Sequence, residues 1–234
     1  MNLKRLLLLA SLSASAALAT TLTVNGIDGA TGLQNSLWIN ENGTNTQLFF
    51  AGGIDITVAG YSRLVYCVDL MTNINVPGTY NTQMDFSNSA NLKRIGWLMQ
   101  NEWPSSNYTG STLQIQGAAF QLAIWDIMMD SGDGFLAGAG KVTQSTDTQN
   151  PTNSAVLTAA AKYETDSFTK TSTYGIVYHN TMTSSPFTVV QTLMGRNATD
   201  GGPSPTPEPG AIVLFGSGLA LIALSQLRRK RHTK

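Results

Sequence analysis

The sequence has little charge and a single cysteine. Charged residues make up 12% of the 234 residues, against about 25% in typical soluble domains. Residues 20–207 carry 13 acidic and seven basic side chains, a net charge of −6. The seven basic residues at the two chain ends, together with Glu208, bring the formal net charge to zero. Because phosphate binding requires a basic surface on the folded part, this distribution excludes a nucleic-acid-binding protein. The hydrophobic content of 42% is too high for a disordered chain.

The sequence also lacks the common patterns of catalytic and cofactor sites. It contains no glycine-rich phosphate loop, no closely spaced pair of histidines and no Ser-His-Asp order. The segment DSGDG at 130–134 contains part of a calcium-loop pattern but lacks the later Glu of the twelve-residue EF-hand. We therefore expect no cofactor and no metal site, and we interpret 130–134 as a turn that ends a helix.

Residues 1–19 have the pattern of a secretory signal peptide. Lys4 and Arg5 precede an apolar run at 6–12, and small residues follow as far as Ala19. This order of a basic segment, a short apolar segment and an A-x-A site predicts cleavage after Ala19. The alternative is a retained anchor, which the run disfavours because it is shorter than the ~20 residues that span a bilayer.

The chain after residue 202 consists of a proline-rich segment, an apolar segment and a basic segment. Residues 203–210 contain four of the eight prolines, and alternating prolines predict a stiff extended linker. Residues 211–227 carry no charge, and at ~1.5 Å per residue a helix of this length suits a thin bilayer, so we expect a transmembrane helix. The basic cluster at 228–234 predicts a cytoplasmic tail, with the body on the other side of the membrane.

This tail resembles the PEP-CTERM sorting signal of bacterial exported proteins. The resemblance rests on Pro207, Glu208 and Pro209, followed by the apolar segment and the basic cluster. It implies an exosortase, a membrane protease-transpeptidase, as processing partner. The implied course is export by the signal peptide, anchoring in the inner membrane by the C-terminal helix, and then release or attachment at the cell surface or extracellular matrix. A plain single-span anchor is the alternative, and neither assigns an activity to the body.

Residues 20–202 are long enough for one domain with a sizeable core. Strand patterns occur at 21–26, 36–40, 46–50, 53–58 and 63–70, and again at 174–180 and 186–194. Helix patterns occur between them at 91–103, from Ser111 or Thr112 to the turn at 130, and at 153–167. This order predicts an α+β, mainly β fold, with a β-sandwich or barrel-like sheet, an inserted helical subdomain and one C-terminal transmembrane helix.

Cys67 is the only cysteine, and it lies in the apolar stretch LVYCVDL. Exported proteins usually carry cysteines in pairs, because an oxidising compartment exposes an odd thiol to cross-linking. The residues alone leave three interpretations open. Cys67 is an inert buried residue, it is a nucleophile whose base would have to be His179, the only histidine of residues 20–202, or it pairs with another chain.

Gln121 is the second unusual residue, because it lies in FQLAIW in the middle of the most apolar predicted helix. A buried amide has four hydrogen-bonding sites and costs a few kcal/mol if they are left unmade. A purely structural glutamine would meet this need by bonding to backbone groups. Gln121 alone is therefore compatible with a structural or a chemical role.

Together, YCVD and FQLAIW resemble the paired motifs of the bacterial thioester domain, or TQxA domain, of surface adhesins. The residues that match are Tyr66, Cys67 and Val68 in the first motif and Phe120, Gln121, Ile124 and Trp125 in the second. Phe120 stands where the commoner family spelling has Thr. The segments KRIGWLMQN and FTVVQTLMG are similar as well, so the resemblance spans about residues 61–195.

The resemblance implies an internal thioester between Cys67 and Gln121, formed with loss of ammonia. Tyr66 and Trp125 are the residues expected to shield it, and the sequence does not decide whether Tyr66 or Asp69 assists the attack. The implied function is covalent attachment to an amine or hydroxyl of an external protein or polysaccharide, without enzymatic turnover. The alternatives are a structural biofilm or matrix protein with an unreactive cross-link or no thioester, and an enzyme that uses Cys67 and His179.

Overall fold

The computed structural model describes residues 20–86, 88–136, 140–183 and 188–197. They belong to one compact unit, Thr20–Pro205. The predicted signal peptide, linker with its PEP triplet, transmembrane helix and basic tail lie outside the described residues and stay predictions. Among the helices that the structure describes, none combines the length and the apolar character needed to cross a membrane.

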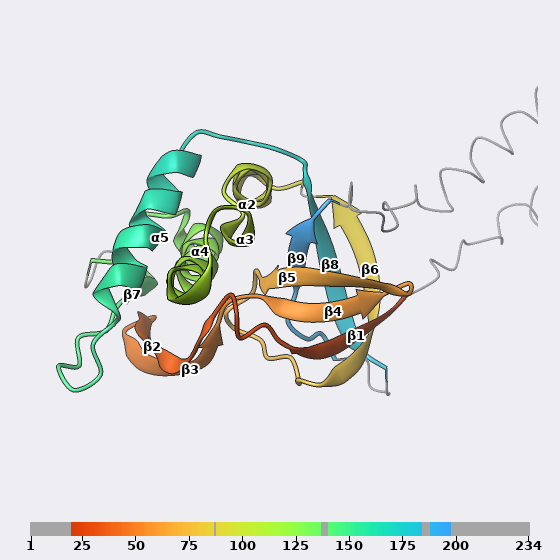
Figure 1. Ribbon diagram of the computed structural model, residues 1–234, viewed down its shortest axis with the longest axis horizontal. Coiled ribbons are helices and arrows are strands. Elements are labelled where there is room, and N and C mark those ends of the chain that lie inside the picture. The colour runs from red at the N-terminus through yellow and green to blue at the C-terminus, as the bar shows by residue number, and fades with distance from the viewer. Residues whose placement is uncertain (1–19, 87, 137–139, 184–187, 198–234) are drawn as a thin grey trace, which may run out of the picture. The chain divides into compact units, whose positions relative to one another are not determined.

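Six antiparallel strands close into a barrel in the order β1-β4-β5-β9-β8-β6 (Figure 1). Their bounds are β1 (Thr20–Ile27), β4 (Ile54–Val58), β5 (Tyr61–Cys67), β6 (Gly78–Phe86), β8 (Gly175–Met182) and β9 (Leu193–Arg196). In β4, Ile54, Ile56 and Val58 are buried while Asp55 is exposed, which is the two-residue period of a strand with one covered face. The predicted α+β class is confirmed, and of the two predicted sheet arrangements the structure has the barrel.

A separate three-stranded sheet has the order β3-β2-β7. It consists of β2 (Leu33–Glu41), β3 (Thr44–Ala51) and the short β7 (Val142–Gln144). Asn42 and Gly43 connect β2 to β3 with φ values of 49° and 82°, as in the two-residue Asn-Gly turn that suits the strand twist of a hairpin. The sequence predicted the two long strands of this sheet but did not separate them from the barrel, and it did not predict β7.

Of the four helices within the described residues, α2, α3 and α4 lie between α5 and the barrel in the view of Figure 1. They are α2 (Ala90–Asn101), α3 (Pro104–Asn107), α4 (Gly110–Asp130) and α5 (Ser154–Ser167). The central one is α4, which contacts α2, α3 and α5 as well as strands of both sheets. Every residue of α4 from Gly117 to Ile127 is buried, which confirms the prediction of a helix buried on most sides.

Several predicted boundaries are wrong for identifiable reasons. The strand predicted at 63–70 ends at Cys67, because the Asp69 carboxylate accepts hydrogen bonds from Met71 N and Thr72 Oγ1 and so closes a turn. The predicted cap of α4 at Ser111 or Thr112 is also wrong, since the helix begins at Gly110 after Thr109.

Two barrel strands, β6 and β9, differ from the prediction. The sequence prediction missed β6, although Tyr80 and Thr82 in GTYNTQMDF are buried and alternate with more exposed polar residues. Of the strand predicted at 186–194, only Leu193 and Met194 lie in β9, and Val189 forms an isolated bridge with Thr181.

Candidate functional site

Cys67 is the last residue of β5, at a point where one edge of the strand has no neighbouring strand. The pairing of β4 with β5 extends only to Ile54 opposite Val65, so β4 offers no partner to Cys67 two residues further on. On the other edge β9 pairs with β5, with Leu193 opposite Cys67. The main-chain N–H and C=O of a buried residue in this position need partners from elsewhere in the fold.

Gln121 supplies both of these partners from the middle of α4. The Cys67 N–H donates to Gln121 Oε1 at 2.9 Å, and Gln121 Nε2 donates to Cys67 O at 2.7 Å. Cys67 is 6% exposed and Gln121 1%. The side-chain amide therefore pairs with the end of β5 as another strand would, and it joins residues that lie 54 positions apart.

Tyr66 lies on the opposite face of β5 from Cys67, as alternation along a strand requires. Its buried ring packs edge-on against Phe120 at 4.9 Å and Trp103 at 5.4 Å between ring centroids. Phe120 in turn packs against Tyr163 of α5 at 5.3 Å. Tyr66 thus holds β5 against α4 at the residue before Gln121. Trp103 and Tyr163 belong to the same aromatic cluster, and sequence reasoning missed their part in it.

Trp125 lies one helical turn after Gln121, which places it on the same side of α4. It is buried, and its indole Nε1 has no hydrogen-bond partner among the described residues. An indole N–H without a partner is unusual in a protein interior. The burial agrees with the predicted shielding role, which itself stays a prediction.

The electrostatic surroundings of Cys67 favour the neutral thiol. Burial raises the pKa of the Cys67 thiol, and the negative charge of Asp69 raises it further. The thiol is therefore protonated at neutral pH, which makes it a poor free nucleophile. Asp69 is not available as a base for it, because both carboxylate oxygens accept hydrogen bonds within the turn at 69–72.

His179 does not form a Cys-His pair with Cys67 in the described part of the chain. It lies in β8 opposite Gln83 of β6, and β9 separates β8 from β5 in the barrel. Its side chain is exposed, whereas that of Cys67 is buried. The arrangement supports no role for His179 as the base that a cysteine nucleophile requires.

Buried polar side chains also hold the segment that follows Cys67. Val68 N donates to Thr192 O at 3.0 Å, and Gln191 Nε2 donates to Asp69 O at 2.9 Å. Asn180 Nδ2 of β8 then donates to Gln191 O at 2.9 Å. Sequence reasoning missed Gln191, although a Gln within the apolar stretch FTVVQTLM is the same kind of signal as Gln121.

A comparison with known families matches the part of the chain that contains both Cys67 and Gln121. Residues 64–166 match the thioester domain family, TED. The match contains Cys67, Gln121 and the helices that lie between β6 and β8 in the sequence. It leaves out β1 to β4 as well as β8 and β9. The searches of curated proteins and of solved structures give no significant match.

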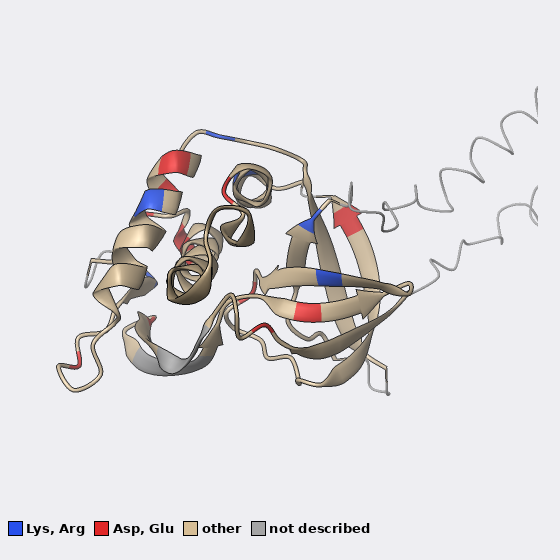
Figure 2. Ribbon diagram, viewed as in Figure 1, with Lys and Arg blue, Asp and Glu red and all other residues tan. Residues whose placement is uncertain are grey.

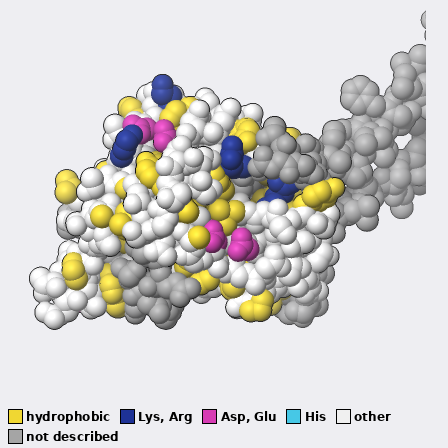
Figure 3. Space-filling view, viewed as in Figure 1, with side chains coloured by type: hydrophobic (Ala, Val, Ile, Leu, Met, Phe, Trp, Pro, Cys, Tyr) yellow, Lys and Arg dark blue, Asp and Glu magenta, His cyan; other side chains and the backbone are white. Residues whose placement is uncertain are grey.

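The thioester domain resemblance is confirmed over this segment, whereas the sorting-signal resemblance lies outside it and stays a prediction. Charged residues are few and interspersed in sign in the view of Figure 2. Hydrophobic side chains on the same face are scattered and do not form one continuous patch (Figure 3). The buried Cys67–Gln121 pair is a well-defined feature of the thioester domain segment.

Proposed function

We propose that Cys67 and Gln121 form an internal thioester, and that the domain uses it to attach covalently to an amine or hydroxyl nucleophile outside the cell. The observation that carries the proposal is the reciprocal hydrogen bonding of the Gln121 amide with the Cys67 main chain. It fixes the side-chain carbonyl of Gln121 at the residue that bears the only thiol. Positioning of this kind raises the effective concentration of two reacting groups by many orders of magnitude.

Formation of the bond uses the same two hydrogen bonds. Cys67 Sγ attacks Gln121 Cδ, and the negative charge that develops on Oε1 is stabilised by the Cys67 N–H already directed at it. The C–N bond then breaks, Nε2 leaves as ammonia with the thiol proton, and its hydrogen bond to Cys67 O is lost. The products are one thioester and one ammonia, and no oxidant or cofactor is needed.

The bond would then be an acyl donor protected by burial. Exclusion of water slows hydrolysis, and the Cys67 N–H continues to polarise the carbonyl. An incoming amine attacks the Gln121 carbonyl carbon, which becomes an amide, and the sulfur leaves with a proton from the amine as the free Cys67 thiol. One such event occurs per molecule, so the domain is a covalent binder and has no turnover.

The proposed setting is the outside of a bacterial cell. The signal peptide pattern supports export, and the tail supports anchoring in the inner membrane and processing by an exosortase-type enzyme. The body would then be released or attached at the cell surface or extracellular matrix. Its partner would be a protein or polysaccharide that presents an amine or hydroxyl group.

Reaction with methylamine tests the attachment function. We expect wild-type protein to gain one methylamine and, at the same time, one thiol that reacts with N-ethylmaleimide. Cys67→Ala is the matched control, because it removes the sulfur but keeps the main-chain bonds to Gln121, and it should gain neither. Labelling of Cys67→Ala to the same extent as wild type would contradict the proposal.

A second candidate is a structural matrix protein whose cross-link never meets a partner. The small exposure of both residues, 6% and 1%, favours it, because a nucleophile would reach the bond only after local opening. In this case the thioester is present but methylamine does not add under native conditions. An enzyme that uses Cys67 would instead show turnover that survives Gln121→Ala, and we expect none.

A further inference from the structure

Four carboxylates meet at the C-terminal end of α4, away from the proposed thioester. We call Asp126, Asp130, Asp133 and Glu164 the acidic cluster. One carboxylate oxygen of each of the three aspartates lies within 4.8 Å of the others. Asp126 and Asp130 are one turn apart in α4, Asp133 follows in the turn, and Glu164 comes from α5.

Backbone groups hold the first two aspartates in place. Gly134 N donates to Asp126 Oδ2 at 3.2 Å, and Lys141 N donates to Asp130 Oδ2 at 2.6 Å. Gly140 lies so close that a Cβ atom there would be 2.5 Å from Asp130 Oδ2 and from Asp133 Oδ1. The main chain thus wraps around the carboxylates and leaves one oxygen of each of the first two directed elsewhere.

Those remaining oxygens are buried and unpaired. Asp126 is 0% exposed, and neither its Oδ1 nor Asp130 Oδ1 accepts a hydrogen bond from any described residue. Glu164 is 6% exposed, and its Oε1 likewise has no N–H or O–H donor from another kind of residue among those described. The carboxyl groups of Glu164 and Asp130 lie within hydrogen-bonding reach of the Asp126 carboxyl, so these acidic groups face one another. Buried carboxylates without partners cost several kcal/mol unless a proton or a cation neutralises them.

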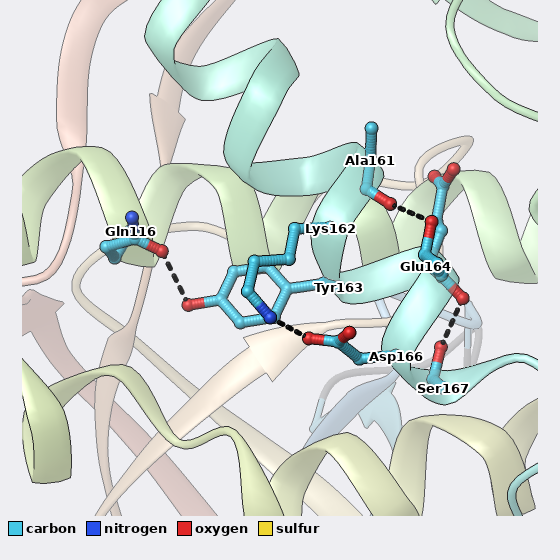
Figure 4. Close-up of polar contacts among 8 residues, drawn as sticks. Gln116, Ala161, Lys162, Tyr163, Glu164, Asp166 and Ser167 are labelled. Carbon is cyan, nitrogen blue, oxygen red and sulfur yellow. Dashed lines mark hydrogen bonds and ion pairs between the residues drawn. The ribbon is translucent and has the colours of Figure 1, made fainter.

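Arg94, whose charge interacts with Glu164 and Asp126, does not bond to their carboxylates. The Arg94 guanidinium donates to Ser167 Oγ at 3.0 Å, to Ser131 O and to Glu164 O at 2.8 Å, all of them neutral oxygens. Figure 4 shows Glu164 bonding to Ser167 through its main-chain oxygen, with the carboxylate outside the contacts drawn. The acidic cluster therefore keeps its free oxygens for another group.

We propose that the acidic cluster binds a divalent cation, calcium in preference to magnesium. Asp126 Oδ1, Asp130 Oδ1 and an oxygen of Asp133 are the ligands. Glu164 adds a further negative charge beside Asp126. Calcium accepts several carboxylate oxygens in a flexible geometry, whereas magnesium requires a near-ideal octahedron and usually keeps several of its waters. Water completes the coordination from a pocket of about 400 Å³ that Asp133, Glu164 and Arg94 line.

The cation would connect three segments that are distant in the sequence. It joins the end of α4 to the following turn and, through Glu164, to α5. The site differs from an EF-hand, because three of its four carboxylates lie on helices and Glu164 follows Asp133 by 31 positions. Its role is to neutralise the acidic cluster and to fix the end of the helix that carries Gln121.

Thermal unfolding of the purified full-length chain in mild detergent tests the site. After treatment with EDTA, we expect millimolar CaCl2 to raise Tm by several degrees in a saturable way, and MgCl2 to raise it less. Isothermal titration calorimetry should give one calcium per chain. Asp130→Asn should lose both responses, and Asp133→Asn, at an exposed position, gives the same test without risk to the core.

Asp55→Asn is the matched control, since it removes an exposed carboxylate from β4 in the barrel, and it should respond to calcium as wild type does. The proposal is overturned if calcium leaves the Tm of wild type unchanged. It is equally overturned if Asp130→Asn and Asp133→Asn respond as strongly as wild type, because the ion then acts at another place.

Discussion

Gln121 has a structural role that the hydrogen bonds show, in addition to the chemical role that we propose. Even without a thioester, its amide satisfies the N–H and C=O of Cys67 where β4 no longer can. A buried pair of hydrogen bonds of this kind is costly to lose, because both main-chain groups are left without partners. The structural role and the proposed chemical role therefore need separate measurements.

The structural role is measured in a background that cannot form a thioester. Relative to Cys67→Ala, the double variant Cys67→Ala, Gln121→Ala should lose about 2–4 kcal/mol of unfolding free energy in urea denaturation, from two hydrogen bonds and a cavity. Gln114→Ala in the same background is the control, since Gln114 bonds to Gly29 O near the surface of the same helix. Equal losses of unfolding free energy for the two glutamines would show that the Gln121 pairing stabilises the fold no more than a hydrogen bond near the surface.

At the scale of elements, α4 carries Gln121 in its middle and the acidic cluster at its end. Burial and the neighbouring carboxylates Glu164 and Asp130 raise the pKa of Asp126. Burial also raises the pKa of Glu164, to about 6. In the absence of a cation, the folded state thus holds protons that the unfolded state releases above its ordinary carboxyl pKa of about 4.

The sign of the pH dependence follows from these raised values. With EDTA present, the stability that these two carboxyl groups contribute is complete below pH 4. It is lost as the pH rises toward and through their raised pKa values in the folded state, so Tm should decrease between pH 5 and pH 8. Asp126→Asn should flatten this decrease and raise Tm at pH 8, because it removes the buried charge. A wild-type Tm that is constant or rises over this range would contradict the account of the acidic cluster.

The helices and strands differ in how well the sequence predicts them. The apolar residues of α4 predict a buried helix, and the alternation in β4 predicts a one-sided strand, because in both cases a single local period decides burial. In β6 the period is weak in the sequence, because the buried positions include Thr82 as well as Tyr80, and its partners β1 and β8 lie far away in the sequence. The sequence drew attention to 130–134 but not to the acidic cluster, since Asp126 lies within the helix and Glu164 comes from another helix.

The sequence likewise identifies the residues of the candidate site but not their contacts. Family resemblance was enough to single out Cys67 and Gln121 from the sequence, but it does not show how they pair. Gln121 can bond to the main chain of Cys67 because the pairing of β4 with β5 stops at Ile54 opposite Val65, which is a property of strand register. Tyr66 was expected to shield the bond, whereas its contacts to Phe120 and Trp103 make it a residue that positions α4 against β5.

At the scale of the whole molecule, the proposed bond would join the barrel to the helices. β5 is a barrel strand paired with β4 and β9, and α4 contacts every other described helix. A covalent link between them closes a loop of more than 50 residues. By analogy with disulfides, closing such a loop lowers the entropy of the unfolded chain and stabilises the fold by about 4 kcal/mol. Acyl reactivity and mechanical connection would thus come from the same bond.

The existence of that bond is the central claim, and intact mass spectrometry of freshly purified protein tests it most directly. The account predicts a wild-type mass one ammonia below the mass of its sequence, with Cys67 closed to N-ethylmaleimide. Cys67→Ala, purified in parallel, should have its full sequence mass and so controls for any processing of the chain ends. A wild-type protein with its full mass and a free Cys67 thiol would contradict the account.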